Sequence, residues 1–275
     1  MIVGGGSGGL AAAMVLARAR RSIMVIDAGR QNNLRTSHSG GVFLHDGANP
    51  EELYPKARKQ LEQYPSALIQ EGKVVGIARS RAGFTVTLAD GSSVETRKAV
   101  LAQGMEFEKS AVPGIDDLWG TKVIHCPFCD GYEARNESVL AVGTPDWLAH
   151  MQIILPNWID DLGWAESATI RAVRDKGGQL SVEFEDGTTE HWDKVMTEVI
   201  FGPRDALAAS LGCKTSAAGH LEVDDFGQTS VPGVFAAGDQ TVPPQQVNLS
   251  VGSGHLAGMG VVFSLSHEDR GGKGA

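Results

Sequence analysis

A glycine-rich turn near the start of the chain constrains the fold more than any other feature of the sequence. Ile2-Val3 runs into Gly4-Gly5-Gly6-Ser7-Gly8-Gly9, and the alanine-rich segment Leu10–Arg18 follows. The spacing is GxGxxG, whose glycines allow a tight turn, close approach of a pyrophosphate and close packing of helix on strand. We therefore predict a strand, a turn and a helix whose N-terminus faces the phosphates. The glycines of the pattern are Gly4, Gly6 and Gly9.

A second strand with a terminal acid extends this unit. The apolar run Ile23–Ile26 ends at Asp27. An acid about 20 residues after the glycines, at the end of the next strand, is positioned to bond ribose hydroxyls. GxGxxG alone leaves a simple glycine-rich loop open, but turn, helix, strand and acid in this order predict nucleotide binding. Because only Met1, Ile2 and Val3 precede the glycines, the first strand is either short or begins upstream of this sequence.

Apolar runs later in the chain predict further strands and a C-terminal helix. Three runs predict a β-meander, two predict buried strands, and a stretch rich in small residues predicts a helix. The meander is Val74–Ile77, Phe84–Leu88 and Val94–Thr96; the buried strands are Ala99–Ala102 and Gly233–Asp239; the helix is Gln246–Leu265. We expect the residues after His267 to form a frayed end.

Charge and composition exclude several classes of partner. The chain has 275 residues, 42% of them hydrophobic, which is enough for one large or two modest domains. A net charge of −9 argues against nucleic acid or an anionic membrane as the main partner. No secretory signal is visible, and no apolar run approaches the roughly 20 residues of a membrane span. With only three cysteines, two of them closely spaced, we expect a reducing, cytoplasmic location.

The segment from His125 to Gly131 carries the chemistry of the chain. Its Cys126-Pro127-Phe128-Cys129 places two thiols at CxxC spacing, which can close a small disulfide ring and usually gives one thiol a lowered pKa. A zinc site would need a second Cys or His pair at ligand spacing, and the remaining cysteine, Cys213, stands alone, so we expect no metal. The alternative to a redox pair is a buried structural CxxC.

The order of these motifs resembles that of the thioredoxin-reductase-like flavoproteins over nearly the whole chain. The motifs are GGGxGG at the start, a strand ending in an A-T-G-like turn at Ala102-Gln103-Gly104, the CxxC-D-G segment, and the V-F-A-A-G-D strand at Val234–Asp239. Gln103 stands where the family usually has threonine. The resemblance implies an α/β fold with a Rossmann-like FAD-binding domain, built from a parallel sheet, helices and a β-meander. A smaller, degenerate nucleotide-binding-like domain that carries the CxxC interrupts it.

The resemblance also implies an FAD site. The first motif would bind the ADP half of FAD, Gly238 would let the backbone approach, and Asp239 would bond the ribityl or pyrophosphate part. Taken alone, Asp239 would be better explained as a helix N-cap, but its place at the end of this strand favours the cofactor role. Gln246 and Val247 match the position whose backbone lies near the flavin pyrimidine ring. The complete set of cofactor-binding residues is Gly4, Gly6, Ser7, Gly8, Gly9, Asp27, Ala28, Gly29, Val74, Ala102, Gln103, Gly104, Gly238, Asp239, Gln246 and Val247.

A second nucleotide site, which the family uses for NADPH, is altered in this sequence. We predict a discontinuous FAD-binding domain at 1–119 and 201–275, with the insert at 120–200. The insert is short for two βαβ units of roughly 30 residues each. Its strand Ser138–Val142 is followed by Gly143, but Pro145 and Leu148 replace the second and third glycines. A proline ring and a leucine side chain oppose the close approaches that glycines permit, so NADPH binding in the usual manner is doubtful.

By resemblance, Cys129 would be the flavin-proximal thiol and Cys126 the thiol that exchanges with substrate. Asp130 matches the acid/base that moves a proton during exchange. His125 is a second candidate base, because an ordinary histidine titrates near pH 6.5. A structural role for His125 remains equally open.

Three functions are left. The first is an FAD-dependent oxidase of a small-molecule dithiol that passes electrons to oxygen. The second is an NADPH-dependent reductase of the thioredoxin reductase type, and the third is a non-catalytic FAD-binding paralogue. The pattern from His125 to Glu133 resembles the branch that closes disulfides in sulfur-containing natural products such as gliotoxin and holomycin. Many members of that branch carry histidine where this chain has Asp130. The resemblance also implies a homodimer.

Overall fold

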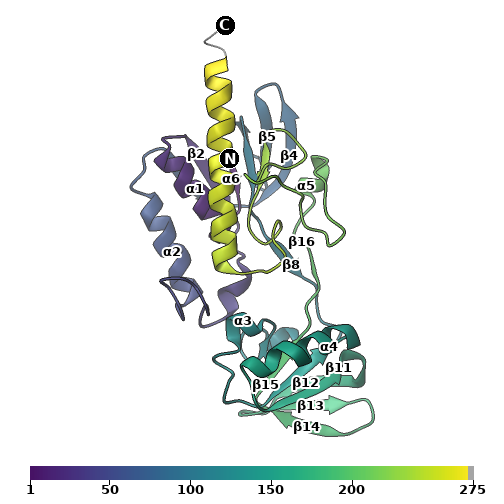
Figure 1. Ribbon diagram of the computed structural model, residues 1–275. Coiled ribbons are helices and arrows are strands. Elements are labelled where there is room, and N and C mark those ends of the chain that lie inside the picture. Colours follow the sequence, from purple (N-terminus) through teal and green to yellow (C-terminus); the bar gives the residue numbers. More distant parts are fainter. Residues whose placement is uncertain (272–275) are drawn as a thin grey trace. The chain divides into compact units, whose positions relative to one another are not determined.

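The computed structural model describes residues 1–271 and divides them into two compact units. Unit 1 comprises Met1–Asn32, Glu51–Glu106 and the chain from Gly202 onward, and unit 2 comprises Asn33–Pro50 and Phe107–Phe201. Figure 1 labels many of their elements. The division differs from the predicted insert at 120–200, because unit 2 also takes in the chain from Phe107 to Trp119 and the separate segment Asn33–Pro50. That segment, called the 33–50 loop below, follows the second strand of the nucleotide-binding unit.

Unit 1 is built on a five-stranded parallel sheet in the order β17-β7-β1-β2-β3. The very short β1 lies at its centre, with Ile2 opposite Val25 on one side and Val100 on the other. Parallel strands covered on both faces are nearly all apolar, and the residues of β1, β7 and β17 are all buried. The strands are β1 (Ile2–Val3), β2 (Ile23–Asp27), β3 (Ala67–Glu71), β7 (Ala99–Leu101) and β17 (Val234–Ala236).

Helices and the meander complete unit 1. The antiparallel meander of β4, β5 and β6 packs its apolar face on the sheet, where Phe84 and Val86 join Val3 and Leu101 in one core. The predicted meander and helix segments are confirmed. The elements are α1 (Ser7–Arg18), α2 (Pro50–Leu61), β4 (Val74–Ser80), β5 (Gly83–Leu88), β6 (Ser93–Thr96), α5 (Leu207–Ser210) and α6 (Val247–Gly271). The chain leaves and re-enters unit 1 at β8 (Met105–Phe107) and β16 (Phe201–Pro203), which pair with each other.

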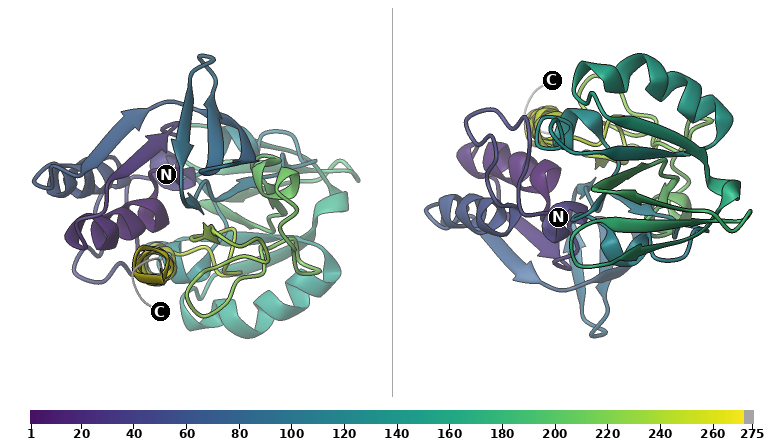
Figure 2. Two further views of the ribbon diagram at one scale, coloured as in Figure 1. Left: turned by 90° about the horizontal axis from the view of Figure 1, so that it is seen from above. Right: turned by 90° about the horizontal axis from the view of Figure 1, so that it is seen from below.

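Helix α6 packs along α1 through small residues (Figures 1 and 2). A Cβ atom on Gly254 would lie 2.1 Å from the carbonyl oxygen of Gly8, so the two backbones touch there. The expectation of a frayed end after His267 is wrong for the residues up to Gly271. Asp269 forms ion pairs with Arg21 and Arg97, and these hold the last turn of α6 in place. Residues 272–275 lie outside the described part of the chain.

By length and composition alone, α6 is also long and apolar enough to cross a membrane, contrary to the sequence-based expectation that no run would be. Its buried residues, which include Ser250, Ala257 and Val261, lie on the side that packs against unit 1. We therefore interpret α6 as a structural helix of unit 1.

Unit 2 has a four-stranded parallel sheet in the order β11-β10-β15-β9 and an antiparallel meander of β12, β13 and β14. Apolar clusters lie on both faces of the parallel sheet, one of them shared with the meander. The elements are β9 (Val123–Ile124), α3 (Pro127–Asp130), β10 (Val139–Gly143), α4 (Pro145–Ile154), β11 (Leu162–Glu166), β12 (Ile170–Asp175), β13 (Leu180–Phe184), β14 (Thr189–Trp192) and β15 (Lys194–Thr197). Short 3-10 turns are Asn32–Arg35, Asp116–Leu118, Leu155–Asn157 and Ser167–Thr169.

Candidate active site

The glycine turn of unit 1 closes tightly between β1 and α1. Gly4 has φ +101°, and a Cβ atom there would lie 2.4 Å from the carbonyl oxygen of Ala102. A Cβ atom on Gly9 would lie 1.9 Å from the carbonyl oxygen of Gly4. No side chain fits at either position, so the turn exposes backbone N–H groups at the start of α1, where an anion is favoured.

Asp27 ends β2 beside this turn, as predicted. Its carboxylate accepts a hydrogen bond from the backbone N–H of Gly5 at 3.0 Å and another from Gln31 Nε2 at 3.0 Å. Arg58 of α2 pairs with the same carboxylate. The sequence interpretation missed Gln31 and Arg58, since nothing in their local sequence marks them. Asp27 is thus held in place at the end of the strand, with its oxygens pointing toward the glycine turn.

The ends of β7 and β17 meet this turn at the same edge of the sheet. A Cβ atom on Gly8 would lie 3.1 Å from the N–H of Gly238, and one on Gly104 would lie 3.8 Å from Asp239 Oδ2. Asp239 Oδ1 accepts a hydrogen bond from Ser250 Oγ at 2.8 Å. Burial raises the pKa of Asp239. Residues from four distant parts of the sequence therefore gather at one edge, where ligands of open α/β sheets bind.

Several polar atoms near this edge have no partner within the described chain. Gln103 donates to Asp205 Oδ1 at 3.1 Å, but its own Oε1 accepts nothing. Arg204 donates to the carbonyl of Met105 at 2.8 Å, while its Nε and both side-chain polar atoms of Gln245 are buried without a hydrogen bond. Buried polar atoms without partners are uncommon and call for a ligand or water. Together with the glycine turn and the two carboxylates, they fit the phosphates and hydroxyls of FAD.

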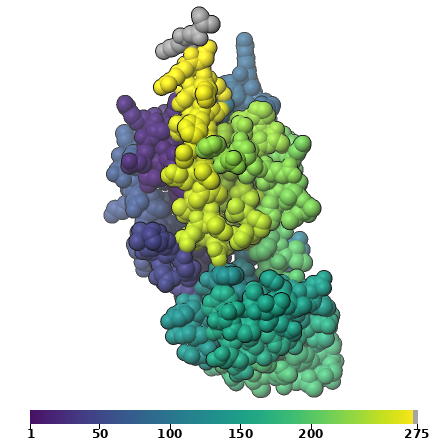
Figure 3. Space-filling view, viewed as in Figure 1, coloured from purple at the N-terminus to yellow at the C-terminus, as the bar shows by residue number. Residues whose placement is uncertain are grey.

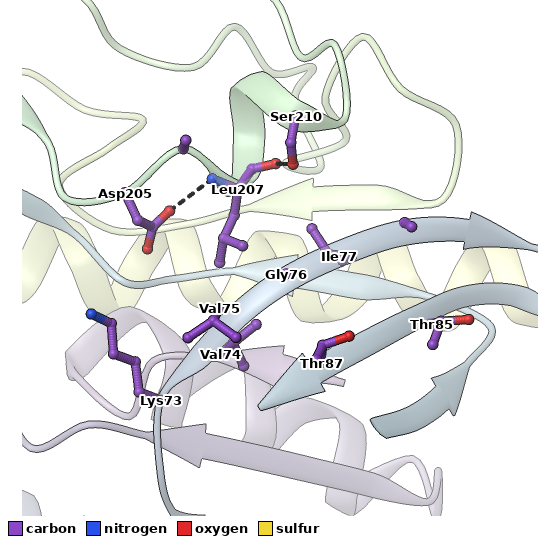
Figure 4. Close-up of a pocket in the computed structure, with 12 residues that line it drawn as sticks. Lys73, Val74, Val75, Gly76, Ile77, Thr85, Thr87, Asp205, Leu207 and Ser210 are labelled. Atoms are coloured by element: carbon purple, nitrogen blue, oxygen red, sulfur yellow. Dashed lines mark hydrogen bonds between the residues drawn. The ribbon is translucent and has the colours of Figure 1, made fainter. Parts of the chain in front are cut away.

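Other predicted cofactor residues are spread more widely. Ala28 and Gly29 are exposed, and the side chain of Val74 belongs to the apolar core. Figure 4 shows that Val74 also borders an open pocket of about 540 Å³ between β4 and α5, with Lys73 and Asp205 at its rim. Gln246 and Val247 lie at the start of α6. The roles of all these residues stay predictions.

The two thiols of the CxxC lie side by side in unit 2. Cys126 precedes α3, and its Sγ lies 2.8 Å from Sγ of Cys129, which donates its S–H. This S–H, helped by the backbone N–H groups of Cys129 and Phe128, lowers the pKa of Cys126. The pKa of Cys129 is raised, because its proton is held by Cys126 and its charged form is poorly solvated. Cys126 is therefore the thiol that more readily becomes a thiolate.

His125 packs among aromatic rings. Its imidazole stacks on Trp119 with ring centres 5.1 Å apart and contacts Phe107 at 5.4 Å. Burial lowers its pKa to about 4. An imidazole with this pKa is neutral at pH 7 and a weak base, so of the two roles left open by the sequence the geometry favours the structural one.

Asp130 is accompanied by two residues that the sequence interpretation missed. His38, from the 33–50 loop, places Nε2 3.5 Å from Asp130 Oδ1 and 3.7 Å from Glu133 Oε2. Burial raises the pKa of Asp130 to about 6, with Glu133 raising it further and the charges of His38 and Lys194 opposing the shift. His38 lies far from the CxxC in sequence, so its place beside Asp130 could be recognised only from the tertiary structure.

The turn between β10 and α4, which the sequence suggested to be an altered nucleotide turn, is filled by side chains of unit 2 itself. A Cβ atom on Gly143 would lie 2.4 Å from the indole of Trp147, whose side chain covers the glycine. Helix α4 starts at Pro145, and the backbone N–H of Thr144 donates to Glu198 Oε2 at 2.7 Å. A carboxylate therefore occupies the end of the helix where a dinucleotide would place its pyrophosphate.

Comparison with known proteins agrees with this picture. Residues 1–144 and 163–254 match the family described as pyridine nucleotide-disulphide oxidoreductase. The chain is 31% identical over 292 residues to thioredoxin reductase tcpT of Claviceps purpurea, covering 94% of this chain and 91% of that protein. It is 30% identical over 305 residues to thioredoxin reductase aclD of Aspergillus oryzae, covering 98% and 97%. The crystal structure of HlmI superposes with a TM-score of 0.92 at 31% identity, covering 98% of this chain and 93% of HlmI.

Proposed function

This chain belongs to the pyridine nucleotide-disulphide oxidoreductase family, and from that premise we propose that it oxidises a small-molecule dithiol to a disulfide, with oxygen as the final electron acceptor. The α/β fold and the resemblance to thioredoxin-reductase-like flavoproteins are confirmed. The chain is an FAD-dependent thiol–disulfide oxidoreductase. The direction of electron flow and the identity of the donor are what we propose here.

The proposed exchange uses the two cysteines in turn. The carboxylate of Asp130 accepts a proton from one substrate thiol, and the resulting thiolate attacks Sγ of Cys126 in the Cys126–Cys129 disulfide. Cys129 leaves and takes the proton from Asp130. The second substrate thiol then attacks the substrate sulfur bonded to Cys126, and its proton passes to the departing Cys126. The lowered pKa of Cys126 suits this step because a more acidic thiol is the better leaving group. The substrate has lost two electrons and two protons, and the cysteine pair has gained them.

When bound, FAD would supply the two-electron chemistry that links the cysteine pair to oxygen, with hydrogen peroxide as the product. The residues proposed to hold it are the glycine turn Gly4–Gly9, Asp27 for the ribose and Asp239 for the ribityl or pyrophosphate part. Buried polar atoms of Gln103 and Arg204 that have no partner support this assignment.

The filled nucleotide turn of unit 2 is the observation that favours an oxidase over a reductase. Glu198 satisfies the N–H of Thr144, and the indole of Trp147 covers Gly143. A bound dinucleotide would have to displace both groups and would bring its phosphates against a carboxylate. We therefore propose that NADPH is not the electron donor and that electrons enter through a substrate dithiol.

The remaining parts of the proposal concern substrate and assembly. We propose a small-molecule dithiol of a sulfur-containing natural product, because the pattern from His125 to Glu133 resembles that branch of the family. We propose a homodimer, supported by the large apolar side chains that α6, the helix drawn in yellow in Figure 3, leaves exposed. The exposed ones are Leu249, Val251, Leu256 and Phe263. We propose a cytoplasmic location, because three cysteines, two of them in the CxxC, provide no disulfide framework of the kind typical of secreted proteins.

Oxygen consumption with dithiothreitol as the sole reductant tests the function. We expect the FAD-loaded protein to consume oxygen and release one hydrogen peroxide for each dithiothreitol oxidised. Cys126→Ser and Cys129→Ser should each abolish turnover while retaining the yellow flavin. Turnover that requires NADPH would instead support a thioredoxin-reductase-type reductase. A protein that takes up FAD but turns over with neither donor would support the non-catalytic paralogue.

A further inference from the structure

The 33–50 loop is fitted to the helix that carries the thiols. A Cβ atom on Gly40 would lie 2.0 Å from the carbonyl oxygen of Cys129, so the two backbones are in contact. The loop is braced on both sides of this contact, where Thr36 Oγ1 donates to the carbonyl of His38 at 2.8 Å and the N–H of Gly47 donates to the carbonyl of Ser39 at 3.1 Å. The loop thereby holds the side chain of His38 beside the acid that follows the second cysteine.

His38 places its Nε2 atom between two carboxylates. Its Nε2 atom is buried, has no hydrogen bond, and lies 3.5 Å from Asp130 Oδ1 and 3.7 Å from Glu133 Oε2. These are ion-pair distances, and a positive charge on an imidazole so placed opposes protonation of the neighbouring carboxylates. The other cation facing Asp130 is Lys194, which itself pairs with Glu137 at 3.3 Å. Among the basic residues that oppose protonation of Asp130, His38 has a larger effect than Lys194.

Building on the dithiol oxidation proposed above, we propose that His38 is a positioning residue whose protonated imidazole keeps Asp130 ionised, so that Asp130 can accept the substrate thiol proton near neutral pH. His38 acts through Asp130 and does not itself touch the sulfurs. Burial alone favours the neutral carboxyl, which could not accept a proton, and the charge of His38 opposes that effect. The negative charges of Asp130 and Glu133 also raise the pKa of Cys129, so the proton passed to that sulfur is retained.

The pH dependence of flavin reduction by dithiothreitol, followed under nitrogen, tests this role. The ratio of variant to wild-type rate at each pH cancels the titration of dithiothreitol itself. For His38→Gln we expect the acid limb of the profile to move up by about one pH unit, since an opposite charge at this distance lowers a carboxyl pKa by about 1 to 3 units. His38→Lys should restore the limb, and His45→Gln, an exposed histidine of the same loop, should leave it in place.

Coupling between the two residues separates a positioning role from a structural one. In the Asp130→Asn background, His38→Gln should cause no further change in the profile. A wild-type-like profile for His38→Gln, or equal losses in both backgrounds, would overturn the role of His38 while leaving dithiol oxidation intact.

If dithiothreitol fails to reduce the wild-type flavin, the proposed function is overturned. The role of His38 can then still be tested by alkylation of Cys126. In the reduced protein at pH 7, Asp130→Asn removes a negative charge near Cys126 and should speed its reaction with iodoacetamide. With His38→Gln already present, Asp130 is partly neutral, so the same substitution should speed alkylation less. Additive effects of the two substitutions would contradict the inference.

Discussion

At the scale of single residues, the two cysteines are chemically distinct although they stand in the same short segment. Sγ of Cys126 accepts hydrogen bonds from the S–H of Cys129 and from nearby backbone N–H groups, while Cys129 keeps its proton. Burial also raises the pKa of the third thiol, Cys213. The asymmetry follows from position: Cys126 comes just before α3 and Cys129 lies within it.

This asymmetry predicts the order of thiol modification. In the reduced protein at pH 7, iodoacetamide should label Cys126 first, because the thiolate is the reactive form and the pKa of Cys126 is lowered. Peptide mass spectrometry over a time course measures the order. Labelling of Cys129 or Cys213 ahead of Cys126 would contradict it, and Cys126→Ser provides the control spectrum.

Burial of Asp130 predicts a pH-dependent cost to stability. Its pKa is about 6 in the folded protein against 3.8 in the unfolded chain, so the folded state binds more protons between these values and loses stability as pH rises through them. Asp130→Asn should therefore stabilise the protein at pH 7.5 by up to about 3 kcal/mol, since one pKa unit corresponds to about 1.4 kcal/mol. Thermal unfolding at pH 4 and 7.5 measures this. An equal gain at both pH values would contradict the burial effect.

Local sequence pointed to some residues of the candidate site and could not point to others. Gly4, Gly9 and Asp27 form a local pattern, because a tight turn and the end of the next strand are fixed by adjacent sequence. His38 reaches Asp130 only through the packing of a distant loop on α3, and no nearby residue marks it. His125 is the opposite case: its place next to Cys126 in sequence left a base and a structural role equally open, and its ring packs on Trp119.

At the scale of elements, α6 and α1 depend on glycines where their backbones touch. Gly254→Ala should destabilise unit 1 by about 1 to 3 kcal/mol, because its methyl group would overlap the carbonyl oxygen of Gly8 and the helices would have to separate. Gly252→Ala, in the same helix but with open space around it, should instead stabilise by up to about 1 kcal/mol through helix propensity. Thermal unfolding of the pair measures both, and an equal effect of the two substitutions would contradict the close contact.

The start of α4 depends on a carboxylate from the end of the neighbouring strand. Glu198→Ala removes the acceptor for the N–H of Thr144 and a favourable charge at the helix N-terminus, which should cost about 1 kcal/mol. Urea unfolding followed by tryptophan fluorescence reports on unit 2, where Trp147 lies beside this contact. Asp160→Ala, an exposed acid of the same unit, is the control. Equal midpoints for the two variants would show that Glu198 does not support the helix.

Most elements of unit 1 could be predicted from hydrophobic pattern. β2, β5 and β7 begin and end close to the predicted residues, because buried parallel strands and a meander leave clear apolar runs. The length of α6 was underestimated, because its last turn is held by ion pairs of Asp269 with Arg21 and Arg97, which lie far away in sequence. Such long-range ion pairs leave no periodic signal at the helix end.

At the scale of the whole molecule, the division of the chain was harder to predict than its fold. The order of motifs was enough to predict the α/β fold and the family, because each motif occupies a fixed place between particular strands. The 33–50 loop was not assigned to unit 2 from sequence, because it directly follows β2 of unit 1. In the structure it packs on α3, the helix of unit 2 that carries Cys129. This placement is what brings His38 to the site.

The central claim is that electrons enter through a dithiol and not through NADPH. Absorbance of the bound flavin, recorded by stopped flow under nitrogen, tests it most directly when the wild-type protein is mixed in parallel with excess dithiothreitol or with excess NADPH. The filled nucleotide turn at Thr144 and Glu198 predicts bleaching by dithiothreitol and an unchanged spectrum with NADPH, followed by return of the yellow colour and release of peroxide when air is admitted. Rapid bleaching by NADPH alone would contradict the account.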